Sequence, residues 1–152
     1  MDSALVHHYF GTKRALFVAS IAIPTNPEDV LGPVLAVDNE HLGEALLTAI
    51  LAVWESKSGD AVVAAFRSMI AGGDTSLLGT FLMQIVLKDI AARVDEPVGS
   101  AQIRVDLVAS QMTGLFLTRH ILKLEPLAST PSPQIVAAVA PTLQRYLTGD
   151  VT

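Results

Sequence analysis

The residues with the clearest chemical pattern lie at the very start of the 152-residue sequence. A short predicted helix over 3–10 presents three side chains that can donate hydrogen bonds, namely His7, His8 and Tyr9. A second predicted helix over 13–23 carries Lys13 in its first turn. Free backbone amides at a helix N-terminus attract anions, and Lys13 adds a full positive charge. Because Tyr and His also donate to phosphate oxygens, this corner of the chain predicts phosphate binding.

Motifs for catalysis or metal binding are missing from the sequence. His7 and His8 are adjacent, so on a helix they point about 100° apart and cannot grip one ion together. Glu40, His41 and Glu44 crowd one helix start, but the Glu-x-x-His spacing of di-iron bundles is not found. The chain has no cysteine, no G-x-S-x-G motif and no phosphate loop. We therefore expect no metal, no cofactor and no enzymatic activity.

Composition points to an apolar helical protein. Hydrophobic residues make up 51% of the chain and charged residues 16%, with a mean hydropathy of +0.48. This is more apolar surface than one small bundle needs, so we expect some of it in a subunit interface or around a cavity, the alternative being a large apolar core. A net charge of −5 argues against a nucleic-acid coat, yet leaves room for DNA contact by one basic end.

Membrane and export segments are not expected. The longest uncharged stretch, 126–144, is interrupted by Pro131, Pro133 and Pro141, so it does not predict a spanning helix. A signal peptide is the rival interpretation, because Lys13 and Arg14 precede an apolar run. That run is short, and an acidic residue and two histidines precede it. Together with the absence of cysteine, this favours the cytoplasm.

Apolar periodicity predicts an all-α fold. Between Pro, Gly and Asp punctuation, the three- and four-residue spacing indicates further helices over 28–36, 40–57, 61–71, 77–94, 101–123 and 134–147. No segment predicts a strand. The result is a helical bundle.

Two functional surfaces are predicted on these helices. Large apolar, aromatic and amide side chains of the central helices could line a ligand pocket or simply pack the core; they are Trp54, Phe66, Met69, Phe81, Met83, Gln84, Met112 and Phe116. Small and apolar residues of the last two helices predict a dimer interface, with an intramolecular core as the alternative; they are Ala109, Gly114, Val136, Val139, Leu143 and Leu147. Such an interface is expected to bury at least about 1,500 Å².

The segment His7-His8-Tyr9-Phe10-Gly11-Thr12-Lys13-Arg14-Ala15-Leu16-Phe17 resembles the end of the DNA-recognition helix in the tetracycline-repressor (TetR) family. The stretches 119–127 and 141–149 are also similar to members of actinobacterial type. The resemblance implies that 24–152 form a helical bundle of the TetR C-terminal ligand-binding and dimerisation type. It implies that 1–23 are the last two helices of a helix-turn-helix head, with recognition helix 3–10 and linking helix 13–23.

By this resemblance the protein is a homodimeric regulator, a repressor, that binds operator DNA and senses a small apolar effector. The resemblance places Asp2, Ser3, Ala4 and Leu5 at the bases, and His7, His8, Tyr9 and Lys13 at the phosphates. A helix-turn-helix head needs two helices before its recognition helix, so we expect the chain as given to bind operator DNA poorly. The alternative is a helical interaction module or ligand carrier without DNA function.

Overall fold

The structure, a computed structural model, describes residues 26–72, 76, 79–80 and 82–151. This part of the chain is helical and holds no β-strand, which confirms the predicted all-α class. The predicted helices over 3–10 and 13–23 lie outside the described residues. So do all the predicted DNA-contacting residues, from Asp2 to Lys13, and Phe81.

The elements follow one another in a simple order along the chain. They are α3 (Pro27–Leu35), the 3₁₀ turn η1 (Asn39–His41), α4 (Leu42–Glu55), α5 (Gly59–Ala71), the π-helical turn η2 (Leu82–Val86), α7 (Lys88–Arg93), α8 (Ala101–Phe116), the π-helical turn η3 (Leu117–Ile121) and α9 (Ser132–Thr148). Among these described elements, none is long and apolar enough to cross a membrane.

Local signals explain where several helices begin. The side chain of Asn26 accepts a hydrogen bond from the Glu28 amide at 3.1 Å, and Pro27 occupies the first turn of α3. Before α8, the Asp95 carboxylate accepts from the amides of Gly99 and Ala101 at 2.7 and 3.0 Å. Gly99 has a φ of 92°, a left-handed conformation that suits glycine.

Two predicted helices contain turns that simple periodicity does not reveal. The prediction over 77–94 is broken by η2, in which the Leu87 amide donates to the carbonyl of Leu82 at 2.9 Å. The prediction over 101–123 changes at Phe116 into η3, in which the Leu122 amide donates to the carbonyl of Leu117 at 2.8 Å. Each bond spans five residues rather than four, so the turn is wider and the facing side chains shift.

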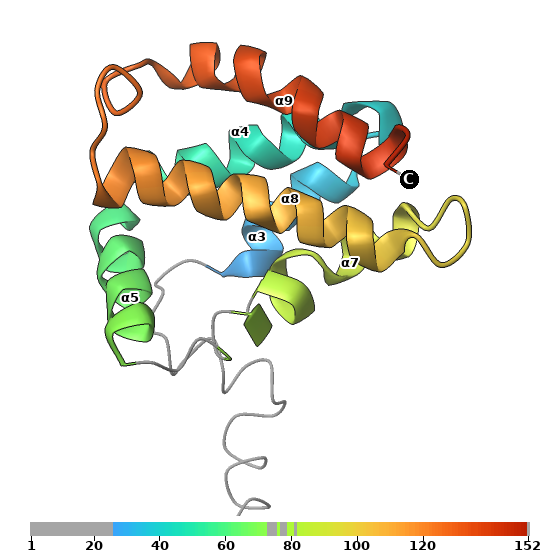
Figure 1. Ribbon diagram of the computed structural model, residues 1–152, viewed down its shortest axis with the longest axis horizontal. Helices are drawn as coiled ribbons and strands as arrows, with labels where there is room; N and C mark the ends of the chain where they lie inside the picture. The colour runs from blue at the N-terminus through green and yellow to red at the C-terminus, as the bar shows by residue number, and fades with distance from the viewer. Residues whose placement is uncertain (1–25, 73–75, 77–78, 81, 152) are drawn as a thin grey trace, which may run out of the picture.

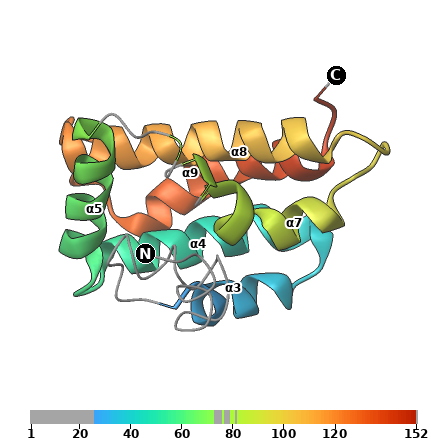
Figure 2. The same ribbon diagram turned by 90° about the horizontal axis from the view of Figure 1, so that it is seen from below.

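The helices pack around α4. This helix contacts α3, α5 and α9, while α8 contacts α7 and α9. Figure 1 shows α4, α8 and α9 running roughly along the long axis, with α5 standing across one end of them; Figure 2 shows the same arrangement from below. Leucines four and five residues apart turn one face of α4 into the core, where they are fully or almost fully buried: Leu42, Leu46, Leu47 and Leu51.

A glycine allows α4 and α9 to approach closely. A Cβ added to Gly43 would lie 2.7 Å from the Gln144 backbone nitrogen and 2.9 Å from the Ala140 carbonyl oxygen. The Gln144 side chain closes the contact, because its Oε1 accepts from the Gly43 amide and its Nε2 donates to the Asn39 carbonyl, each at 2.8 Å. Any side chain at position 43 would push the two helices apart.

A buried arginine binds backbone carbonyls at the C-terminal end of α9. Arg104 on α8 is 3% exposed, and its guanidinium donates to the carbonyls of Tyr146, Gly149 and Glu96 at 2.8–2.9 Å and to the Ser100 hydroxyl at 3.0 Å. Carbonyls at a helix C-terminus carry partial negative charge, so they suit a cation.

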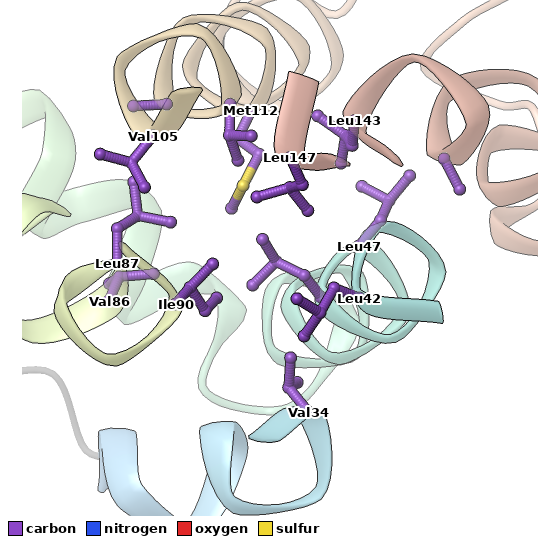
Figure 3. Close-up of a cluster of buried hydrophobic side chains, with 14 of the residues drawn as sticks. Val34, Leu42, Leu47, Val86, Leu87, Ile90, Val105, Met112, Leu143 and Leu147 are labelled. Atoms are coloured by element: carbon purple, nitrogen blue, oxygen red, sulfur yellow. The ribbon is translucent and has the colours of Figure 1, made fainter. Parts of the chain in front are cut away.

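The packing corrects part of the predicted dimer interface. Ala109, Leu143 and Leu147 are 7%, 0% and 1% exposed and belong to the core of their own chain. In Figure 3, Leu143 and Leu147 point from α9 into this cluster, toward α4 and α8. The most apolar stripe of a helix faces its own core, and the prediction took that stripe for the subunit surface.

The other three predicted interface residues are placed differently. Val136 and Val139 are half-buried against the same core. Gly114 faces open space, because a Cβ added there meets no atom within 4 Å.

Candidate functional site

An apolar cavity lies where α5 meets α4, η2 and α8. Its volume is about 80 Å³, and it is lined by Ile50, Trp54, Val62, Phe66, Met69, Leu82, Val86, Met112, Thr113 and Phe116. Helical spacing produces this lining, since Val62, Phe66 and Met69 occupy one face of α5. The Thr113 hydroxyl is one of the few polar groups in the wall, so the cavity suits an apolar group.

Five of the eight predicted pocket residues line this cavity: Trp54, Phe66, Met69, Met112 and Phe116. Met83 and Gln84 do not. Gln84 is exposed, and Met83 packs beside the core, where the Gln102 amide lies 3.7 Å from its sulfur. The π-helical turn explains the error, because it brings Leu82 and Val86 to the cavity instead.

Four rings form a continuous cluster at this end of the molecule. Phe116 lies at its centre, with ring centroids 4.9 Å from Trp54, 4.6 Å from Phe66 and 5.4 Å from His120. Trp54 and His120 also meet edge to face at 5.5 Å. Tilted and edge-to-face rings are mutually stabilising, so the cluster forms a firm wall between the cavity and the surface beyond His120.

A wider, polar cleft lies on the other side of this wall. Its volume is about 760 Å³, and its lining is Trp54, Gly59, Asp60, Val63, Ala64, Arg67, Arg119, His120, Lys123, Glu125 and Ala128. Trp54 borders both spaces. The cleft therefore begins where the apolar cavity ends.

Arg119 is the most buried polar residue of the cleft. It is 8% exposed, donates to the carbonyls of Leu127 and Thr130 at 2.8 and 2.6 Å, and pairs with Glu55 at 2.8 Å. Burial alone would raise the pKa of Glu55, but hydrogen bonds from Ser132 and Arg119 outweigh it and lower that pKa. Glu55 is thus held ionised beside Arg119.

The histidine of the cleft is held in its neutral form. Burial, followed by the nearby Arg119 cation, lowers the pKa of His120, while Glu55 opposes the shift. Within the described part of the chain, His120 Nε2 and Arg119 Nε are buried without a hydrogen-bond partner. Buried polar atoms are nearly always paired, so these two atoms mark the wall of the cleft as unusual.

The carboxylates and histidine near the start of α4 form a surface pair rather than a metal cluster. Asp38 accepts from His41 at 2.5 Å, and both side chains are exposed. The hydrogen bond and charge of Asp38 raise the pKa of His41, and His41 lowers the pKa of Asp38. Among the described residues, no group of three or more His, Asp or Glu side chains could hold a metal ion.

Sequence reasoning missed the cleft, although a signal was present. Phe116, His120 and Lys123 are spaced by four and three residues, which places them along one face of a helix. The helix face that carries the predicted pocket residue Phe116 therefore continues to His120 and Lys123.

Comparison with known proteins agrees with this architecture. Residues 40–147 match the family described as tetracyclin repressor-like, C-terminal domain. The crystal structure of a TetR-family regulator from Streptomyces coelicolor A3 is similar, with a TM-score of 0.59 and 25% sequence identity. The similarity covers 97% of this chain and 77% of that one. No curated protein sequence matches the chain at a significant level.

Proposed function

Because the chain belongs to the TetR family of transcriptional regulators, we propose that its helical body is a dimerising sensor for a small, largely apolar effector. The observation that carries this proposal is the ring-lined cavity beside α5, which lies inside the family-matched region. About 80 Å³ holds only a small group, whereas pockets for drug-sized ligands span about 300–1,000 Å³. A larger effector would have to displace side chains, and so would move α5 or α8.

The outer face of α8 is proposed as the dimer surface, in place of the buried residues predicted from sequence. Its side chains alternate between four- and three-residue spacing, as in helices that pair along a seam: Ile103, Leu107, Ser110, Gly114 and Leu117. Ile103 is 46% exposed, and Gly114 has open space in front of it. Figure 2 shows α8 along one edge of the molecule, so a two-fold partner can approach this stripe.

The DNA-binding part of the proposal rests on the sequence before residue 24. The start of the recognition helix (Asp2, Ser3, Ala4 and Leu5) would face bases, while His7, His8, Tyr9 and Lys13 would hold phosphates. Two such heads must reach adjacent major grooves about 34 Å apart. An effector that alters their separation would release the DNA, which is the action of a repressor.

The substitution Lys13→Ala tests whether Lys13 contacts a DNA phosphate. It is made in a longer form of the protein that binds DNA. Loss of one phosphate contact should weaken binding to all sequences alike and reduce the slope of log affinity against log salt by about one unit. Fluorescence anisotropy with sites selected from a random DNA pool measures both quantities. Lys88→Ala, an exposed lysine on α7, is the charge-matched control. Equal affinity and equal salt slope for Lys13→Ala and the control would remove the phosphate assignment.

A further inference from the structure

The apolar cavity and the polar cleft are neighbours on either side of the ring cluster. α5 contributes adjacent faces to them, with Val62, Phe66 and Met69 on the cavity side and Asp60, Val63 and Arg67 on the cleft side. From the other wall, Phe116 lines the cavity and His120 lines the cleft one turn later. Trp54 belongs to both. A molecule that fills the cavity and reaches the cleft must therefore displace part of the ring cluster at Trp54.

The cleft carries more positive than negative side chains. Arg67, Arg119 and Lys123 line it together with Asp60 and Glu125. Glu125 is turned to its own loop, where it accepts from the hydroxyl and amide of Ser129. Arg67 and Lys123 are exposed at the mouth, and neither forms an ion pair within the described part of the chain. These two cations are free to meet an anion.

Two further features lie at this end of the cleft. Lys123 has a φ of 52°, a left-handed conformation that glycine adopts more easily than lysine. It follows the π-helical turn η3, and the amide of Leu124 next to it donates to the Thr118 carbonyl at 3.0 Å, so this conformation ends the helix. In the wall, the Nε of Arg119 and the Nε2 of His120 are buried and have no hydrogen-bond partner among the described residues. A ligand that opened this wall would give the Arg119 Nε–H an acceptor.

We propose that the cavity and the cleft together bind an amphipathic monoanion, a small molecule with an apolar body among the rings and a carboxylate between Arg67 and Lys123. This proposal rests on the proposed function, because it gives the chemical class of the effector. Because Arg119 is already paired with Glu55, Arg67 and Lys123 are the two lining cations left for the carboxylate. The small cavity limits the body to a short chain or one ring.

Trp54 makes the proposal directly measurable. It is the one tryptophan of the sequence and lines both the cavity and the cleft. We would titrate the protein with two matched pairs, hexanoate with hexanamide and 3-phenylpropanoate with its amide, and follow tryptophan emission. Each amide keeps the shape and loses the charge. We expect each carboxylate to bind about tenfold more tightly than its amide, the gain of a charge-assisted contact.

Two variants test the cations separately from the fold. Arg67→Gln and Lys123→Gly should each weaken carboxylate binding at least about fivefold and leave amide binding unchanged. Lys123→Gly should also raise the melting temperature, since glycine relieves the strained φ. Loss of affinity in a more stable protein cannot be attributed to misfolding. Lys88→Gln, an exposed lysine that lines neither space, should change neither property.

The failures of the two proposals are distinguishable. Equal affinity for acid and amide, with a clear change in Trp54 emission, would overturn the anion proposal and leave the apolar sensor intact. Carboxylate binding that survives in both Arg67→Gln and Lys123→Gly would also overturn it. If neither member of either pair changes the emission, the proposed site is wrong as a whole, whereas the DNA and dimer assignments would still stand on their own tests.

Discussion

Two arginines of α8 and η3 are buried in different ways, and the difference decides what each does. Arg119 meets a carboxylate, Glu55, and lies beside the cleft. Arg104 is held by three backbone carbonyls and a hydroxyl, and it lines neither the cavity nor the cleft. Arg104 therefore has a structural role, because its hydrogen bonds connect the end of α9 to the loop before α8.

Arg104→Ala should lower the free energy of unfolding by about 2–4 kcal/mol, because several buried carbonyls lose their donor. Thermal or urea denaturation measures the loss. Arg145→Ala, an exposed arginine on α9, should change the stability by less than about 0.5 kcal/mol. Equal effects of the two substitutions would show that the Arg104 contacts contribute little.

The neutral state of His120 predicts a pH dependence of stability. Its pKa is lowered in the fold, so below the ordinary histidine pKa the unfolded chain binds the extra proton more readily. The contribution of His120 to the free energy of unfolding is therefore fully present above about pH 6.5, and it is lost as the pH falls below that value. Glu55, whose pKa is lowered, contributes only at more acidic pH.

His120→Phe should remove this dependence while keeping the ring contacts with Trp54 and Phe116. The measurement is the midpoint of urea denaturation at about pH 7 and about pH 5.5. The variant should lose less stability than the wild type between these values. The exposed His41, whose pKa is raised, titrates in both proteins and so cancels from the comparison. A larger loss in the variant would contradict the assignment of a neutral His120.

At the scale of the elements, periodicity predicted the positions of the helices and missed the breaks inside two of them. The predicted helix over 61–71 is found at Gly59–Ala71, and that over 134–147 at Ser132–Thr148. The π-helical turns η2 and η3 were not predicted, because tertiary packing rather than local propensity sets a five-residue bond. The same turn misplaced Met83 and Gln84.

The site was partly predictable for a related reason. Large apolar residues at helical spacing identified five cavity residues, since each helix turns one face inward. The spacing of apolar residues does not tell which face of a helix meets a partner subunit and which meets its own core. For this reason Leu143 and Leu147 were wrongly predicted to lie in the interface. The cleft could not be predicted, because it forms only where α5 crosses the end of the bundle. That crossing depends on packing between segments that are distant in the sequence.

The contact between α4 and α9 gives a prediction at this scale. Gly43→Ala should destabilise the protein by about 1–3 kcal/mol, because the new Cβ meets α9 backbone atoms that cannot yield alone. Gly32→Ala is the matched control, since its Cβ meets nothing within 4 Å. It should change the stability by less than about 0.5 kcal/mol, because the helix propensity gain of alanine is offset by Pro33, which disfavours a helical residue before it. Chemical denaturation measures the free energy of unfolding of both variants. If Gly43→Ala stabilised the protein, the close approach of α4 and α9 would be refuted.

For the molecule as a whole, α8 connects the proposed sensor to the proposed interface. Met112 and Phe116 face the cavity, while Gly114 and Leu117 belong to the outer stripe. A ligand that displaces the inner side chains would press on the helix that carries the interface. Coupling between sites requires such a shared element with two positions, and α8 is the one that both surfaces share.

The central claim, that this body dimerises through the outer stripe of α8, is tested most directly by sedimentation equilibrium of the wild type and Gly114→Arg. Position 114 faces open space, and arginine favours a helix more than glycine, so the variant should fold at least as well. We predict a wild-type mass of twice the 16.1 kDa chain and a monomeric variant with an unchanged circular dichroism spectrum. A monomeric wild type, or a variant that dimerises equally well, would contradict the claim.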